Sequence, residues 1–158
     1  MSLFLIRHAH AVSADENPNR PLSPRGRQQV RRLAAFLAKS GGFGCAELWH
    51  SPLARSIETA GRLVQHLGLE ARLTLTPGLE GDDPPDRIAA RLRSRRAPLA
   101  LVGHEPHLSA LATLLVSGRT EPSGFVLKKC AVLALVRRAG AWSVLWQITP
   151  QLYAPDSH

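Results

Sequence analysis

Aromatic residues make up only 5% of this 158-residue chain, and cysteine occurs twice. So few aromatic rings leave few platforms on which nucleobases could stack, which argues against a binder of single-stranded nucleic acid. Cys45 and Cys130 lie far apart, with no CxxC pair and no spacing typical of a zinc site. We expect both to be small core residues that stay reduced, as in a reducing compartment.

Long apolar runs are also missing. No stretch reaches the roughly 18 consecutive apolar residues of a membrane-spanning helix. The apolar run at residues 3–6 is too short for a secretory signal and ends at Arg7. These absences predict a cytoplasmic protein that has no membrane segment.

Acidic residues are the minority, at 12 against 20 lysines and arginines, so the formal net charge is +8. Such an excess attracts anions, and arginine is the better bidentate ligand for phosphate. The arginine-rich stretch 87–96 by itself resembles a nucleic-acid interface. Because aromatic residues are not interleaved with these arginines, we interpret the stretch as a solvated helix face and expect no nucleic-acid partner.

Length and composition fit a single domain, residues 1–158, with a sizeable hydrophobic core. Short apolar runs alternate with segments whose apolar residues recur at helical spacing. The expected strands cover 2–6, 45–50, 72–75 and 98–102, and the expected helices cover 24–40, 52–67, 86–95 and 106–116. Two last apolar runs, 126–136 and 142–148, are typical of a hairpin. This alternation predicts an α/β fold on a largely parallel sheet.

Two of the expected helices open with Ser-Pro, at residues 23–24 and 51–52. Serine is a common N-cap, and proline is favoured at the first helical position, so both serines are expected to cap their helices. The inward face of the second helix is expected to carry Leu53, Ile57, Ala60, Val64 and Leu67.

Two histidines follow expected strands directly: His8 comes after Arg7 at the end of the first strand, and His104 follows Gly103. In open α/β sheets, ligands bind beyond the carboxyl ends of the strands, so we expect the two histidines to share one site. Arg55 falls in the first turn of the second helix, where the helix dipole disfavours a cation. An arginine there indicates a bound anion, because helix N-termini also bind phosphate.

In this order, the elements resemble the histidine phosphatase (phosphoglycerate mutase-like) superfamily. The family's opening strand ends in Arg-His-Gly, matched at residues 4–9 with Ala9 in place of glycine. Its Pro-Leu-Ser/Thr-x-x-Gly-x-x-Gln segment corresponds to 21–29, its Ser-Pro-x-x-Arg-x-x-x-Thr-Ala segment to 51–60, and its Gly-His strand end to 103–104. The short chain is most similar to the small SixA-type phosphohistidine phosphatases. The resemblance implies a phosphoglycerate mutase-like, three-layer α/β/α fold with a mostly parallel central sheet.

The resemblance also implies the chemistry. His8 would be the nucleophile and form a phosphohistidine intermediate, which water then hydrolyses. Arg7, Arg55 and His104 would hold the phosphoryl oxygens, where the charge of the transition state is spread. No metal or other cofactor is implied, because the arginines supply the positive charge.

Two further residues are candidates for the same site. Glu80, in the turn-rich acidic loop 76–85, is the best candidate for a general acid, with Asp82 and Asp83 behind it; the alternative is a solvated loop carboxylate. Arg20, in the loop before Pro21, is a candidate phosphate contact.

The expected partner is a phosphorylated substrate. We favour phosphohistidine on a protein, because a short chain without insertions over the site can admit a side chain displayed by a partner. The alternative is a small phosphomonoester, such as a sugar or nucleotide phosphate. A metal site built from His8, His10, His104 and His107 is a different hypothesis, which the nearby Arg7 and Arg55 disfavour because they would repel a cation.

Overall fold

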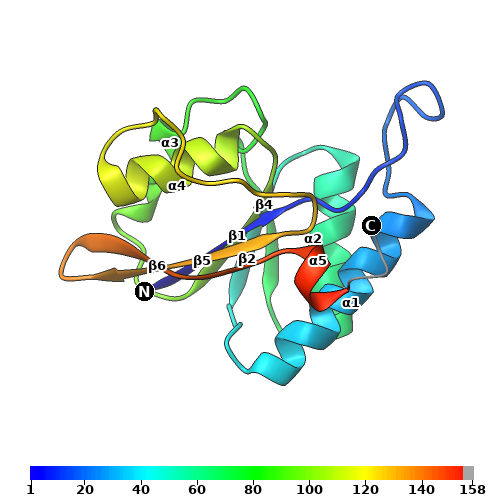
Figure 1. The fold of residues 1–158 in the computed structure, drawn as a ribbon, viewed down its shortest axis with the longest axis horizontal. Helices are drawn as coiled ribbons and strands as arrows, with labels where there is room; N and C mark the ends of the chain where they lie inside the picture. Colours follow the sequence, from blue (N-terminus) through cyan, green and yellow to red (C-terminus); the bar gives the residue numbers. More distant parts are fainter. Residues whose placement is uncertain (155–158) are drawn as a thin grey trace.

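Six strands form one mixed sheet in a computed structural model that describes residues 1–154 (Figure 1). The strands are β1 (Ser2–Arg7), β2 (Glu47–His50), β3 (Arg72–Leu75), β4 (Leu99–Gly103), β5 (Val132–Arg138) and β6 (Ala141–Ile148). Their order across the sheet is β3-β2-β4-β1-β5-β6. The first four run parallel, and β5 and β6 form the antiparallel hairpin expected at the end of the chain.

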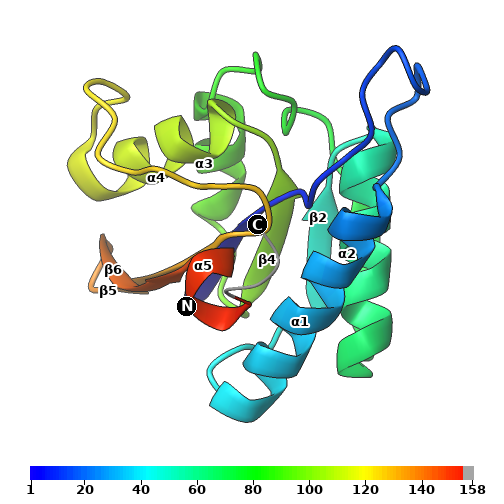
Figure 2. The same cartoon turned by 45° about the vertical axis from the view of Figure 1, so that its right-hand side comes forward.

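Five helices cover the two faces of this sheet. One face carries α1 (Pro24–Ser40), α2 (Ala54–Leu67) and the short α5 (Pro150–Tyr153), and the other carries α3 (Asp86–Leu92) and α4 (His107–Ser117) (Figures 1 and 2). The predicted three-layer α/β/α fold is therefore confirmed. No helix in residues 1–154 has the length and apolarity to cross a membrane.

Strand β1 shows why the sheet is covered on both sides. Phe4 and Ile6 pack into the core beneath α1 and α2, whereas Leu3 and Leu5 pack into the core beneath α3 and α4. All four side chains are almost fully buried, and each contributes roughly 2 kcal/mol of hydrophobic free energy to folding. A continuous apolar run, rather than an alternating one, is what a strand buried on both faces requires.

Helix α2 differs from the expectation in its start and in its buried face. It begins at Ala54, and the residue before it, Leu53, makes no side-chain cap. Its buried residues are Ser56, Thr59, Ala60 and Leu63, while Ile57 is 43% exposed. Ala60 is buried as expected, and Val64 and Leu67 pack against the core from partly buried positions. The apolar pattern missed two buried side chains that are hydroxyls with specific partners. Ser56 Oγ donates to Val102 O at 2.8 Å, and Thr59 Oγ1 accepts from Ala9 N at 3.0 Å.

The other departure lies before β5. Residues 126–131 were expected to belong to the strand, but β5 begins at Val132 and Val126 is 74% exposed. The preceding segment turns around the end of β1: Arg7 Nη1 donates to Leu127 O at 2.9 Å, and Cys130 N donates to Arg7 O at 3.0 Å. Contacts with β1 therefore replace the strand pairing. Helix α5 was not expected, because four residues are too few for a periodic signal.

Helix α1 follows the prediction closely. Ser23 caps it by accepting a hydrogen bond from Gly26 N at 3.0 Å, and Gly41 ends it in the left-handed conformation. Gly26 also permits a close approach, because a Cβ added there would lie 1.9 Å from the carbonyl oxygen of His10. A side chain at this position would push helix α1 away from the segment that follows β1.

This contact predicts opposite effects of two Gly→Ala substitutions. Gly26→Ala should lower the free energy of unfolding by at least about 2 kcal/mol, because backbone has to move. Gly61→Ala is the matched control inside α2, where nothing lies within 4 Å of the added Cβ, and it should raise stability by up to about 1 kcal/mol. Urea unfolding of the two variants measures both effects. Equal stabilities would show that the contact at Gly26 relaxes without cost.

Candidate functional site

Three parallel strands end at the same edge of the sheet. Arg7 pairs with Gly103 in the β1–β4 register, and His50 pairs with Val102 in the β2–β4 register. The residues that follow, His8, Ser51 and His104, therefore gather at one place. The ring centroids of His8 and His104 are 5.0 Å apart, so the shared site expected from the two strand ends is present.

A pocket of about 570 Å³ lies at this edge. All six residues singled out from the sequence line it: Arg7, His8, Arg20, Arg55, Glu80 and His104. Asp82 and Asp83 also line it, together with Leu53, Gly81, Glu105 and Lys129. The structure thus brings the expected residues together, and their chemical roles stay predictions.

His8 is held with one ring nitrogen committed to the backbone. Its Nδ1 lies 2.7 Å from Ala9 O, a carbonyl that can only accept, so Nδ1 carries the proton and Nε2 keeps its lone pair. Burial is the main cause that lowers the pKa of His8 to about 3; the bond to Ala9 opposes this shift, and His104, Arg55 and Arg7 add to it. At neutral pH the ring is therefore uncharged, as a nucleophile must be.

His104 contacts Ser51, a residue that the sequence pattern predicted to be the N-cap of α2. Its Nε2 lies 2.6 Å from Ser51 Oγ, so Ser51, expected to cap α2, contacts the histidine instead. Ser51 Oγ also accepts from Leu53 N at 3.3 Å, which leaves its own proton available for His104 Nε2. In that arrangement Nδ1 of His104 carries a proton that it can donate to an anion. Burial, followed by Arg55, lowers the pKa of His104 to about 4.

The two arginines present unused donors. The Nε atoms of Arg7 and Arg55 are buried and have no hydrogen-bond partner among the described residues. Burial lowers the pKa of both guanidinium groups. An unsatisfied buried donor costs roughly 1–3 kcal/mol, and more when it is charged, so a structure that keeps two of them is suited to binding an oxyanion.

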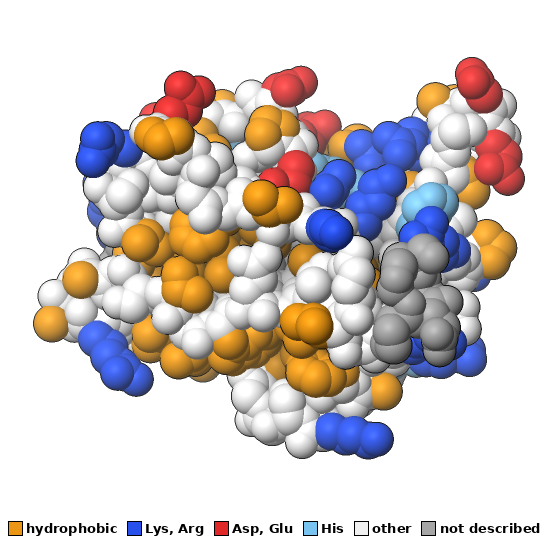
Figure 3. Space-filling view, in the orientation of Figure 1, with side chains coloured by type: hydrophobic (Ala, Val, Ile, Leu, Met, Phe, Trp, Pro, Cys, Tyr) orange, Lys and Arg blue, Asp and Glu red, His pale blue; other side chains and the backbone are white. Residues whose placement is uncertain are grey.

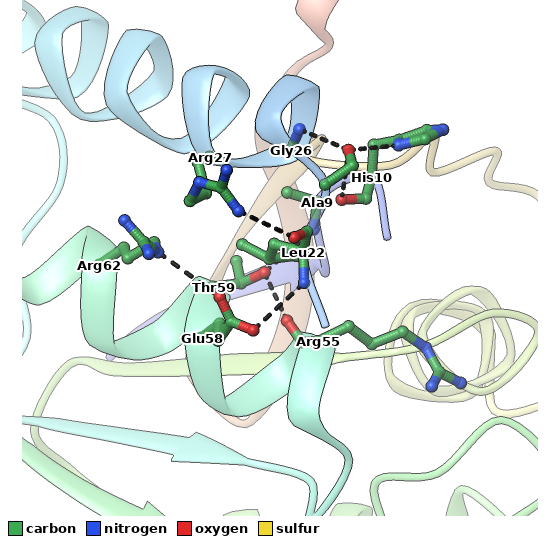
Figure 4. Close-up of polar contacts among 10 residues, drawn as sticks. Ala9, His10, Leu22, Gly26, Arg27, Arg55, Glu58, Thr59 and Arg62 are labelled. Carbon is green, nitrogen blue, oxygen red and sulfur yellow. Dashed lines mark hydrogen bonds and ion pairs between the residues drawn. The ribbon is translucent and has the colours of Figure 1, made fainter. Parts of the chain in front are cut away.

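Thr59 connects the segment that follows β1 to the first turn of α2, which carries Arg55 (Figure 4). Its hydroxyl accepts from Ala9 N and donates to Arg55 O at 2.7 Å. The preceding residue, Glu58, accepts from Leu22 N at 3.2 Å and pairs with Arg62 at 3.6 Å. The side chain of Arg55 extends away from this group of contacts. Hydrogen bonds close to Arg55 therefore fix the position of α2 relative to the end of β1.

Glu80 and Arg20 reach the pocket from two loops. Glu80 is exposed, and its backbone N–H donates to Asp83 Oδ2 at 2.8 Å. The loop is held against the His104 segment, because a Cβ at Gly81 would lie only 2.8 Å from Glu105 O. Arg20 donates from Nε to Val12 O at 3.0 Å. Both residues line the same pocket as Arg7, His8, Arg55 and His104.

Of the four histidines named in the metal hypothesis, only His8 and His104 line the pocket among the described residues. His10 Nδ1 lies 2.6 Å from Ser23 Oγ, at the start of α1. His107 is buried in α4, and neither of its ring nitrogens has a partner among the described residues. Within residues 1–154 no three His, Cys, Asp or Glu side chains are grouped as metal ligands.

Comparisons with known proteins agree with this geometry. The family model of the histidine phosphatase superfamily (branch 1) matches residues 3–80. No curated protein matches the chain.

Several solved structures share the fold. The protein histidine phosphatase SixA complexed with tungstate has a TM-score of 0.82 and 24% identity, over 95% of this chain and 97% of that chain. The alpha-ribazole phosphatase from Shigella flexneri has a TM-score of 0.75 and 18% identity, covering 91% and 94%. The phosphoserine phosphatase from Entamoeba histolytica, in complex with 3-phosphoglyceric acid, has a TM-score of 0.69 and 18% identity, covering 95% and 98%. At these identities the likeness shows a common fold.

The lowered histidine pKa values predict how stability depends on pH. The pKa values of His8 and His104 lie below the ordinary 6.5, so the unfolded chain binds protons that the folded chain does not. Stability should be full above about pH 6.5 and fall steadily toward pH 4. His8→Asn should reduce this slope by roughly one proton, as measured by urea unfolding at a series of pH values. The control His66→Asn, at an exposed position, should keep the parent slope. An unchanged slope in His8→Asn would mean that His8 is charged in the folded protein.

Proposed function

Since the chain belongs to the histidine phosphatase superfamily, we propose that it removes the phosphoryl group from phosphohistidine on a protein substrate. The observation that carries this proposal is the state of His8. Its ring is neutral, its Nδ1 proton is held by Ala9 O, and it lies in one pocket with Arg7, Arg55 and His104.

In the first step, the lone pair of His8 Nε2 attacks phosphorus in line with the bond to the leaving nitrogen. That bond breaks as the new P–N bond forms, and the substrate histidine departs with a proton. Arg7, Arg55 and His104 donate to the three equatorial oxygens, where negative charge is spread in the transition state. The unused Nε donors of the arginines serve this purpose, and each such donor is worth on the order of 3 kcal/mol.

In the second step, water attacks the phosphoryl group on His8, inorganic phosphate leaves, and Nε2 recovers its lone pair. The same three donors stabilise this transition state, since the phosphoryl group has not moved away from them. Glu80 lies in the pocket and can give a proton to the leaving group or take one from the water.

A protein substrate is favoured by the shape of the site and by one relative. Loops 8–22 and 76–85 stand on either side of the strand ends (Figures 1 and 2), and the side chains of the pocket are mostly charged. Such a site suits a phosphorylated side chain presented on a surface. Among the similar structures, the protein histidine phosphatase SixA holds tungstate, an oxyanion.

Hydrolysis of a small phosphomonoester is the second candidate. Proteins that act on small phosphorylated molecules, the alpha-ribazole phosphatase and the phosphoserine phosphatase, share this fold. A pocket of about 570 Å³ can also hold a metabolite. The two candidates differ in how much they depend on a proton donor, because an alkoxide is a much poorer leaving group than a protonated imidazole.

Glu80→Gln separates the two candidates. With a phosphohistidine protein, the variant should lose little kcat/KM, because solvent can protonate the leaving nitrogen. With an alkyl phosphate it should lose about 100-fold. The matched control is Glu70→Gln, an exposed carboxylate between α2 and β3, which should keep the parent kinetics on both substrates.

The proposal also requires the parent enzyme to prefer the phosphohistidine protein in kcat/KM over a panel of sugar, nucleotide and amino-acid phosphates. A preference for one phosphomonoester, together with a large Glu80→Gln loss on it, would assign the enzyme to the second candidate.

A further inference from the structure

We propose that a second anion-binding subsite adjoins the phosphoryl pocket, bounded by Lys129, and that it binds an acidic side chain next to the phosphohistidine of the protein substrate. This inference rests on the proposed function and adds to it a preference for acidic sequence around the phosphorylated residue.

A second pocket, of about 260 Å³, lies beside the first. Arg7 and Lys129 line both pockets, so the two are adjacent. The other described polar residues that line the second pocket are His10, Arg25, Gln29, Lys128 and Gln151. Figure 3 shows Lys and Arg side chains gathered on the upper right of the molecule, beside histidine side chains.

The two pockets differ in their carboxylates. The phosphoryl pocket is lined by four acidic residues, Glu80, Asp82, Asp83 and Glu105, whereas no Asp or Glu of residues 1–154 lines the second pocket. Among the described residues that line the second pocket, every charged side chain is therefore that of an Arg or Lys, and none is a carboxylate. A concave surface of one sign concentrates the field and attracts a counter-ion.

Lys129 is held in place beside the nucleophile rather than on a free loop. The next residue, Cys130, donates its backbone N–H to Arg7 O at 3.0 Å and His8 O at 3.2 Å. Its carbonyl accepts from the hydroxyl of Tyr153 in α5 at 2.7 Å. These bonds fix the turn that carries Lys129 against the end of β1, so its backbone is positioned together with that of His8.

The position of Lys129 is electrostatically unfavourable while no anion is bound. Burial lowers the pKa of Lys129, and Arg7, Arg20, Arg25 and Arg55 lower it further. The transferred phosphoryl group already has donors in Arg7, Arg55 and His104. A carboxylate bound at Lys129 would offset the remaining repulsion, which explains a lysine at this place.

Two phosphohistidine peptides test the subsite. They are identical except that the residues flanking the phosphohistidine are Glu in one and Gln in the other. The parent enzyme should favour the Glu peptide by about tenfold in kcat/KM, mainly through KM. Lys129→Met should remove most of that preference. Lys39→Met, at an exposed lysine near the end of α1, is the matched control and should keep it.

Two results would overturn the subsite. The first is a parent enzyme that treats the two peptides alike. The second is an equal loss on both peptides in Lys129→Met, which would place Lys129 on the phosphoryl group itself. Circular dichroism of both variants confirms that they are folded.

A second pair of substrates separates failure of the subsite from failure of the proposed function. Phenyl phosphate and 3-carboxyphenyl phosphate differ in one carboxylate and contain no phosphohistidine. If only the esters are hydrolysed, the proposed function fails and the acidic-peptide substrate fails with it. A Lys129-dependent preference for 3-carboxyphenyl phosphate would then show that the anion subsite itself is present and serves a small substrate. If no pair shows a Lys129-dependent preference, the subsite is absent.

Discussion

Parallel pairing of β1 with β4 places Arg7 opposite Gly103, and the rest of the site depends on that register. Because side chains alternate between the faces of a strand, a slip of one residue would exchange Leu5 and Ile6 between the two cores. It would also separate His8 from His104. The hydrophobic burial of β1 on both faces is therefore what holds two histidines, distant in sequence, with their rings 5.0 Å apart.

Two hydroxyl groups of α2 hold this helix in place against the ends of the strands. Ser56 bonds to β4 through Val102 O, and Thr59 bonds to the end of β1 through Ala9 N. Together they fix the helix that presents Arg55 to the pocket. The protein thus gathers partly buried cations and keeps two histidines neutral, an arrangement that opposes stability while no anion is bound. Functional sites commonly carry such a cost, which the surrounding core offsets.

The sequence predicted the residues whose role follows from their position in a regular element. The strand ends at His8 and His104 and the first turn of a helix at Arg55 could all be located from periodicity and caps. Ser51 was misassigned because a hydroxyl at a helix start can cap the backbone or bond elsewhere, and only the approach of His104 decides between these. Ile57 was expected inside because apolar spacing cannot recognise a buried face made partly of Ser56 and Thr59. Lys129 was not found at all, since its place beside His8 arises from a turn far along the chain.

In the proposed reaction, the phosphoryl group passes through Nε2 of His8. The most direct measurement is a single-turnover reaction with excess enzyme and a substrate labelled in its phosphoryl group. The reaction is quenched in alkali, in which phosphohistidine survives, and the labelled peptides are identified by mass spectrometry. We expect a label on the peptide that contains His8, and this label should rise and then decay as phosphate is released. Folded His8→Ala should carry no label and should release no phosphate. Release of phosphate at the normal rate without any label on His8, or with the label on another residue, would contradict it.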